Sequence, residues 1–185
     1  LKKETDYFIE CLVHPQREAM IHIFFGERAA SKVSDVPKDT PIMDIKKAGI
    51  IGSGTMGGGI AMCFANAGIP VHIIDQDADN LKRGISVIEK NYEFMVNRGR
   101  MTAEQKDFVF GLVTSSLDYN DVHDCDIVIE AVYENLELKT KIFKSLDEAV
   151  KPGAILASNT SGLDIDSIAN STSRPELVVG THFFS

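Results

Sequence analysis

From residue 45 onward, short apolar runs alternate with segments that have helical spacing. The runs at 48–51, 71–74, 126–130, 154–157 and 177–180 predict strands, and we expect a further short strand at 113–117. Strands covered on both faces of a parallel sheet lose the apolar–polar alternation and read as continuous apolar runs. Between them, residues 56–67, 78–98, 102–110, 135–150 and 164–170 have the spacing of amphipathic helices. This alternation predicts an α/β fold with a doubly wound parallel sheet.

One part of this region departs from the alternation. Residues 78–98 and 102–110 follow each other without an intervening strand. Thr102 and Gln105 have the spacing of a capping box at the start of the second helix. We therefore expect a helical pair inserted into the α/β domain.

Residues 1–44 differ from the rest of the chain. Helical spacing occurs at 4–12 and at 17–31, and the remainder has the composition of a linker. We therefore divide the chain into an N-terminal helical linker, 1–44, and a domain, 45–185. The helices form either a packed cap on that domain or a connector from a module that precedes it.

A glycine cluster, Gly52-Ser-Gly54-Thr-Met-Gly57, follows the first predicted strand directly. Gly52 would allow a tight turn, Gly54 a close approach to a pyrophosphate, and Gly57 close packing of the next helix on the sheet. The free N–H groups and the dipole of a helix N-terminus favour a bound phosphate. The cluster predicts a Rossmann-like dinucleotide site.

Asp75 ends the second predicted strand, 23 residues after Gly52. A carboxylate at about this spacing accepts hydrogen bonds from the adenosine ribose of NAD. Gln76 and Asp77 follow it, without an arginine to receive the 2′-phosphate of NADP. The alternative for Asp75 is a helix N-cap. Because strand, glycine turn, helix, strand and acid occur in one unit, we favour NAD as the cofactor.

Charge argues against two classes of partner. The net charge of −8 gives no basic surface for nucleic acid or an anionic membrane. The uncharged stretch 48–74 could be mistaken for a membrane span, but its glycines, Pro70 and His72 favour strand, turn, helix and strand. We therefore expect no nucleic-acid partner and no membrane span.

The cysteines and the spacing of possible metal ligands allow two further predictions. The three cysteines form no C-x-x-C pair, and their odd number suits reduced thiols in an intracellular compartment. We expect Cys63 to fill the core of a buried helix. The run from His123 to Asp126 could suggest a metal cluster, but adjacent residues cannot all face one ion. We interpret it as a solvated turn and predict no metal.

Hydroxyl and imidazole groups follow two later strands. Ser158-Asn-Thr-Ser161 comes after one predicted strand, and His182 comes after the last. Ligands bind outside the carboxyl ends of strands in such sheets. An imidazole changes its charge near neutral pH and could accept the proton of a secondary alcohol, while Ser161 could hold the substrate oxygen. The alternative for His182 is a histidine packed in the core.

Several motifs together resemble one family. Residues 46–185 resemble the NAD-binding domain of the L-3-hydroxyacyl-CoA dehydrogenases, which oxidise 3-hydroxyacyl-CoA to 3-ketoacyl-CoA in fatty-acid β-oxidation. The resemblance is carried by Gly-Ser-Gly-Thr-Met-Gly at 52–57, Asp75, Glu-Ala-Val-Tyr-Glu-Asn at 130–135 with Lys139, Ser158-Asn-Thr-Ser161 and His182-Phe-Phe.

The resemblance implies roles for individual residues. His182 would be the catalytic base, and Ser161 would contact both substrate and nicotinamide. The cofactor contacts implied are Gly54, Thr55 and Met56 at the pyrophosphate, Asp75 at the ribose, and Val132, Tyr133, Glu134 and Lys139 beside the cofactor. For Lys139, the ordinary alternative is a solvated surface lysine.

The resemblance also implies parts that this sequence lacks. The glutamate that orients the catalytic histidine and the C-terminal helical substrate domain would both lie beyond Ser185. We therefore expect the isolated chain to bind NADH but to turn over poorly.

Two features make the chain similar to one subgroup of this family. Ser185 stands where many single-function relatives have Asn, and residues 24–32 are similar to the linker of peroxisomal multifunctional enzymes. From this resemblance we expect a hydratase domain before this chain, an acyl-CoA substrate and a peroxisomal location. Mitochondrial and cytoplasmic locations are the alternatives. A stand-alone 3-hydroxybutyryl-CoA dehydrogenase and a non-catalytic NAD-binding module are the alternative functions.

Overall fold

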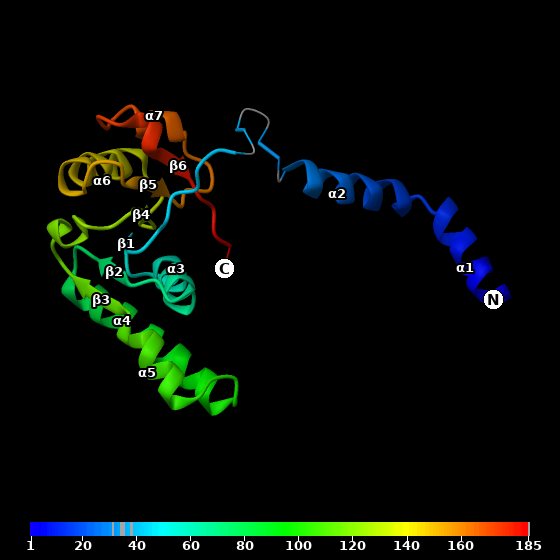
Figure 1. Ribbon diagram of the computed structural model, residues 1–185, viewed down its shortest axis with the longest axis horizontal. Coiled ribbons are helices and arrows are strands. Elements are labelled where there is room, and N and C mark those ends of the chain that lie inside the picture. Colours follow the sequence, from blue (N-terminus) through cyan, green and yellow to red (C-terminus); the bar gives the residue numbers. More distant parts are fainter. Residues whose placement is uncertain (31, 34–35, 38, 185) are drawn as a thin grey trace. The chain divides into compact units, whose positions relative to one another are not determined.

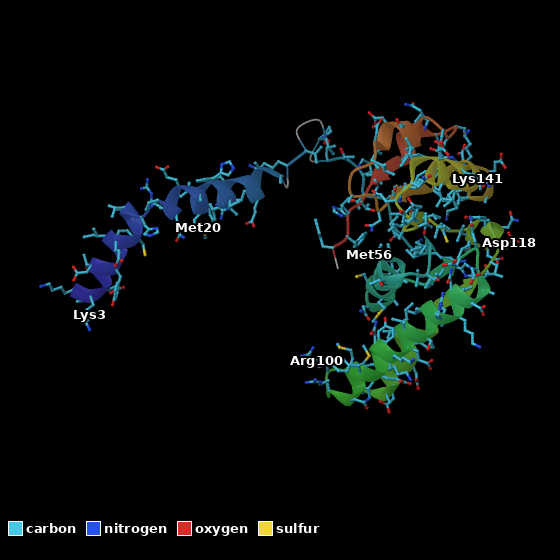
Figure 2. The ribbon with its side chains drawn as sticks, turned by 180° about the vertical axis from the view of Figure 1, so that it is seen from behind. Lys3, Met20, Met56, Arg100, Asp118 and Lys141 are labelled. Atoms are coloured by element: carbon cyan, nitrogen blue, oxygen red, sulfur yellow. The ribbon has the colours of Figure 1, made fainter. Side chains whose placement is uncertain are left out.

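The computed structural model describes residues 1–30, 32–33, 36–37 and 39–184, and the chain divides into two units, Leu1–Met43 and Asp44–Ser185 (Figure 1). The first unit holds α1 (Lys2–Val13) and α2 (Gln16–Ala30), separated at Pro15 as predicted. Neither helix contains a buried residue over these described ranges, and their side chains project from the ribbon in Figure 2. Ser31, the predicted end of the second helix, lies outside the described residues.

The second unit is built on six parallel strands in the order β3-β2-β1-β4-β5-β6. This order is that of the doubly wound dinucleotide-binding fold, so the predicted fold class is confirmed. The strands are β1 (Ala48–Ile51), β2 (Val71–Ile74), β3 (Val113–Ser116), β4 (Ile127–Glu130), β5 (Ile155–Ser158) and β6 (Val178–Gly180).

Helices cover both faces of this sheet, with α3 to α5 on one side and α6 and α7 on the other (Figure 1). They are α3 (Thr55–Asn66), α4 (Ala78–Asn97), α5 (Ala103–Gly111), α6 (Leu136–Ala149) and α7 (Ile165–Ala169). The predicted helical pair is α4 and α5, and the Thr102–Gln105 capping box is present. Arg100 marks the turn between these two helices in Figure 2. Two short 3₁₀ helices, η1 (Tyr119–Val122) and η2 (Pro175–Leu177), were not predicted.

Two apolar cores lie on the two faces of the sheet. In α3, Ile60, Ala61 and Ala65 are buried in the first core. Cys63 is exposed, so its predicted burial is wrong. At about 100° per residue it lies some 200° round the helix from Ala61, on the outer face.

The turn at 123–126 is less solvated than predicted. Cys125 is fully buried in the second core, and burial raises the pKa of its thiol to about 12. One carboxylate oxygen of Asp126 accepts hydrogen bonds from the backbone N–H groups of Lys46 (2.7 Å) and Lys47 (3.0 Å). The turn therefore anchors the chain just before β1, while His123 and Asp124 remain exposed.

The strand register aligns five strand ends at one edge. Ile51 pairs with Ile74 on one side and with Glu130 on the other, Glu130 pairs with Ser158, and Ser158 pairs with Gly180. The residues that follow these ends therefore emerge together. The chain order reverses between β1 and β4, where such sheets open a ligand crevice.

Candidate functional site

The turn after β1 requires two of its glycines. Gly52 has φ +103°, and a Cβ there would lie 2.8 Å from the carbonyl oxygen of Ala131. A Cβ on Gly57 would lie 1.9 Å from the carbonyl oxygen of Gly52. The predicted tight turn and close helix packing are both present. Gly54 instead faces open space, which leaves room for a ligand beside the backbone.

The N-terminus of α3 has no capping side chain. Its N-cap is Gly54, and no side chain accepts a hydrogen bond from the first turn. Within the described part of the second unit, the other α-helices each have one: Asp77, Thr102, Asn135 and Asp164. The first N–H groups of an α-helix have no partner inside the helix. At α3 they fit an anionic group, as the glycine motif predicts.

Asp75 follows β2 and is anchored to the glycine turn. One of its oxygens accepts hydrogen bonds from the backbone N–H (2.9 Å) and the hydroxyl (2.6 Å) of Ser53. Partial burial acts to raise the pKa of Asp75, but these bonds and those from the next two backbone N–H groups outweigh it and lower the pKa. The carboxylate is therefore ionised at neutral pH and held beside the turn.

A cavity of about 760 Å³ opens at this edge of the sheet. Seven predicted cofactor residues line it: Gly52, Gly54, Thr55, Asp75, Gln76, Val132 and Tyr133. Its volume is within the range of ordinary ligand pockets. Met56 is half-buried and Gly57 buried in the first turn of α3, and neither lines the cavity.

Sequence reasoning missed several lining residues, among them Ser53, Tyr119, Asn80 and Arg83. Arg83 lies on α4, where its guanidinium donates to the amide oxygen of Asn80. The predicted lack of an arginine therefore holds for the residues next to Asp75 but not for the cavity. The helical spacing from Asn80 to Arg83 could have shown that both lie on one face of α4.

The loops after β5 and β6 bring Ser161 and His182 to the same edge, outside the cavity lining. The Thr181 N–H donates to the carbonyl of Ser158 (2.9 Å), and the Phe183 N–H donates to the side-chain oxygen of Asn159 (2.7 Å). The His182 side chain is exposed, with its ring 4.4 Å from that of Phe184. Its exposure rules out the alternative of a core histidine.

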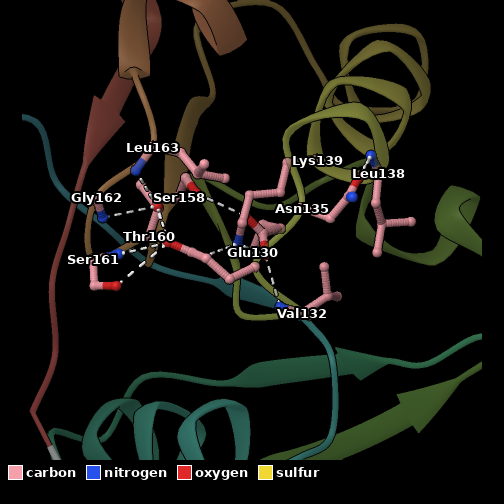
Figure 3. A network of polar contacts seen from close by, with 11 residues as sticks. Glu130, Val132, Asn135, Leu138, Lys139, Ser158, Thr160, Ser161, Gly162 and Leu163 are labelled. Carbon is pink, nitrogen blue, oxygen red and sulfur yellow. Dashed lines mark hydrogen bonds and ion pairs between the residues drawn. The ribbon is translucent and has the colours of Figure 1, made fainter.

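A polar network centred on the buried Lys139 joins the ends of β4 and β5 to the start of α6 (Figure 3). Lys139 is 1% exposed, and its Nζ lies 2.7 Å from Glu130 and 3.2 Å from Glu134. This burial excludes a solvated lysine. Neither Lys139 nor Glu134 lines the cavity, so their predicted place beside the cofactor stays a prediction.

The network includes residues to which the sequence assigned no role. Glu130 and Ser158 are fully buried, and the Ser158 hydroxyl donates to the Glu130 carboxylate (2.7 Å). Thr160 donates to Glu134, as do the N–H (3.0 Å) and hydroxyl (3.4 Å) of Ser161. Desolvation acts to raise the pKa of Glu134, but bonds from Thr160, Ser161 and Lys139 lower it to about 2.

Two kinds of feature are absent from the described residues. No helix among them is long and apolar enough to cross a membrane. Across the same part of the chain, no three histidine, cysteine, aspartate or glutamate side chains are grouped so as to hold a metal ion.

Comparison with known proteins agrees with this geometry. The family model described as "3-hydroxyacyl-CoA dehydrogenase, NAD binding domain" matches residues 47–185. The chain belongs to this family. NAD is thus the cofactor of this dehydrogenase domain, and the uncapped turn of α3, the ionised Asp75 and the cavity fit it.

Individual relatives match the whole chain. It is 40% identical over 193 residues to the human "Peroxisomal bifunctional enzyme" and 39% identical over 186 residues to the "Fatty acid oxidation complex subunit alpha" of Shewanella oneidensis. Each match covers 100% of this chain and 26% of the relative. The dehydrogenase domain and its N-terminal helices thus span about a quarter of these relatives.

A solved structure matches about three quarters of the chain. FadB2 of M. tuberculosis is 40% identical with a TM-score of 0.75, and the match covers 77% of this chain and 50% of FadB2. The structural neighbour therefore agrees with the α/β fold.

Proposed function

We propose that this chain is the NAD-binding part of an L-3-hydroxyacyl-CoA dehydrogenase of fatty-acid β-oxidation. The observation that carries the proposal is the convergence, at one sheet edge, of the glycine turn, Asp75, the Ser161 loop and the His182 segment. In a chain of this family, these groups would supply a cofactor site, a base for the hydroxyl proton and a hydrogen-bond donor for the substrate oxygen.

The chain's own residues divide the cofactor site between them. The first N–H groups of α3, at Thr55 and Met56, would bind the pyrophosphate beside Gly54. Asp75 would accept hydrogen bonds from the adenosine ribose. Val132 and Tyr133 line the cavity, and Glu134, which follows them in the chain, pairs with Lys139; the nicotinamide end would lie beside these residues. When bound, NAD⁺ supplies the hydride acceptor.

The substrate chemistry needs a base and a group that holds oxygen. In the oxidation, the 3-hydroxyl loses its proton, the hydrogen on C3 leaves with its electron pair, and a C=O bond forms. His182 would take the hydroxyl proton, since its side chain is exposed beyond β6. Ser161 would donate a hydrogen bond to the same oxygen.

We further propose that the whole protein is multifunctional and peroxisomal, with a hydratase domain before this chain and a helical substrate domain after it. The match to the human relative extends through residues 1–44, which supports this over a stand-alone 3-hydroxybutyryl-CoA dehydrogenase. The name of the bacterial relative supports a role in fatty-acid oxidation but gives no peroxisomal location. On its own, the 185-residue chain would bind NADH and oxidise 3-hydroxyacyl-CoA slowly.

The test is the substitution His182→Gln in the whole protein. Oxidation of 3-hydroxyacyl-CoA, followed through NADH absorbance, should fall by about 10² to 10⁴-fold, because general-base catalysis contributes that much. The dissociation constant for NADH should stay close to that of the unmutated protein, since His182 does not line the cavity.

Unchanged turnover in this variant would remove His182 from the base role. If the unmutated whole protein binds NADH but oxidises no 3-hydroxyacyl-CoA, the non-catalytic NAD-binding module is the better description.

A further inference from the structure

We propose that Glu130 is a positioning residue that holds Ser161 for the reaction through Lys139 and Glu134, without itself contacting cofactor or substrate. The proposal rests on the proposed function, because it assumes that Ser161 contacts the substrate oxygen. It adds a residue that the motifs did not single out for any role, at the first position of the stretch 130–135.

The first step is the fixed position of the Glu130 carboxylate. Glu130 ends β4 and is fully buried. Its carboxylate accepts three hydrogen bonds, each of 2.7 Å, from the Val132 N–H, the Lys139 ammonium and the Ser158 hydroxyl. A buried carboxylate that is hydrogen-bonded on both oxygens has little freedom to move. It forms a rigid anchor between β4, β5 and α6.

The Lys139 ammonium links Glu130 to Glu134. Lys139 reaches Glu130 Oε1 at 2.7 Å and Glu134 Oε2 at 3.2 Å with the same ammonium group. Because Lys139 is only 1% exposed, its ammonium cannot turn to water. Glu134, whose side chain is 40% exposed, is therefore held from behind by a cation that Glu130 fixes in place.

The Glu134 carboxylate in turn holds Ser161. Glu134 Oε1 accepts hydrogen bonds from the Ser161 N–H at 3.0 Å and from its hydroxyl at 3.4 Å. Thr160 donates to the same oxygen, and its hydroxyl oxygen accepts the Leu163 N–H at 2.9 Å. Residues 159–163 form no helix or strand, so these side-chain bonds set the shape of the loop (Figure 3).

Charge explains why the anchor has to be an acid. Two carboxylates share one ammonium in this network. Glu130→Gln keeps the shape of the side chain but removes one negative charge. The ammonium of Lys139 would then pair with Glu134 alone and draw it inward, away from the Ser161 loop. Misplacement of a reacting group by about 1 Å can cost about 100-fold in rate.

The experiment is a double-mutant cycle in the whole protein, with Glu130→Gln, Ser161→Ala and the two combined. We expect Glu130→Gln to lower kcat about 100-fold, with much smaller changes in KM and in the NADH dissociation constant. If Glu130 acts through Ser161, the double variant will be about as slow as Ser161→Ala alone. Fully multiplicative losses would overturn the proposal.

A matched control separates this effect from general loss of charge. Glu137 lies in the first turn of α6 and is exposed. Glu137→Gln makes the same chemical change on the surface and should leave kcat unchanged. If Glu130→Gln does not fold, Glu130→Gln with Lys139→Met removes both buried charges together, and the same cycle with Ser161→Ala is run on that background.

A second readout does not depend on activity, so it distinguishes failure of this proposal from failure of the proposed function. Amide hydrogen exchange should become faster at residues 160–163 in Glu130→Gln and stay unchanged at the glycine turn, 52–57. Unchanged exchange at 160–163 would overturn the positioning role even if turnover were normal in the unmutated protein. If exchange becomes faster in Glu130→Gln but the unmutated protein oxidises no 3-hydroxyacyl-CoA, the positioning role of Glu130 stands and the proposed reaction is wrong.

Discussion

Asp75 has two tasks at the scale of the single residue, because its carboxylate holds the glycine turn through Ser53 and also faces the cavity. Asp75→Ala should weaken NADH binding by about 10 to 100-fold, since hydrogen bonds to a charged group contribute about 1.5–3 kcal/mol. It should also reduce the preference for NAD over NADP, because the charge that repels a 2′-phosphate is gone. Titration of both cofactors by fluorescence measures both effects.

Ser53→Ala is the matched control for this prediction. It keeps the carboxylate and removes only the 2.6 Å hydroxyl bond, so the loss of NADH affinity should be less than about tenfold. Equal losses in the two variants would mean that Asp75 matters through the turn rather than through the ribose. Equal binding of NAD and NADP by the unmutated protein would contradict its role in selectivity.

Single residues also show which parts of the site could be predicted from the sequence. Gly52, Gly57 and Asp75 were predictable because backbone geometry limits which residues fit those positions, and the spacing is local. The ion pair of Glu130 with Lys139 was not, because an acid and a lysine nine residues apart look solvated until both are buried. The Ser158 hydroxyl meets Glu130 only through the register of β4 and β5, which local spacing does not reveal.

At the scale of elements, the packing of α3 against the end of β1 depends on the missing side chain at Gly57. Gly57→Ala would place a methyl group 1.9 Å from the Gly52 carbonyl oxygen. Overpacking of this kind costs about 1–3 kcal/mol, which lowers the midpoint of thermal unfolding by roughly 2–12 °C in a protein of this size. NADH binding should be lost with the turn.

Gly59→Ala is the control within the same helix, because a Cβ there meets nothing within 4 Å. Alanine favours a helix over glycine by up to about 1 kcal/mol, so this variant should be as stable as the unmutated protein or more so. Thermal unfolding of both variants side by side decides the matter. Equal midpoints would mean that the turn can move away from the added methyl group.

Most elements were predicted because their patterns are local, and the exceptions have identifiable causes. Most strands of the doubly wound sheet were found because both of its faces are covered, which leaves continuous apolar runs; the edge strand β3, Val-Thr-Ser-Ser, is the exception. The turn at 123–126 was misjudged because Cys125 is buried by its position before β4, not by the character of its neighbours. Cys63 was misjudged because its place on the outer face of α3 follows from the helix phase.

At the scale of the whole molecule, the described residues that line the cavity all lie between Ile51 and Ile142, within the second unit. Removal of residues 1–43 should therefore change the NADH dissociation constant by no more than about twofold, as expected for independent parts of a protein. Calorimetric titration of the shortened and the original chain tests this. A larger loss would show that the N-terminal helices support the cofactor site.

The missing cap of α3 has a consequence for the protein in its working environment. Since no side chain closes that helix, the pyrophosphate would complete it, and the bound nucleotide becomes in effect a structural component. At a free concentration of 100 times the dissociation constant, a ligand adds about 2.7 kcal/mol to stability by mass action. The lifetime of the folded domain would then depend on the nucleotide concentration in its compartment. Depletion of the cofactor would therefore stop turnover and also lower the amount of folded protein.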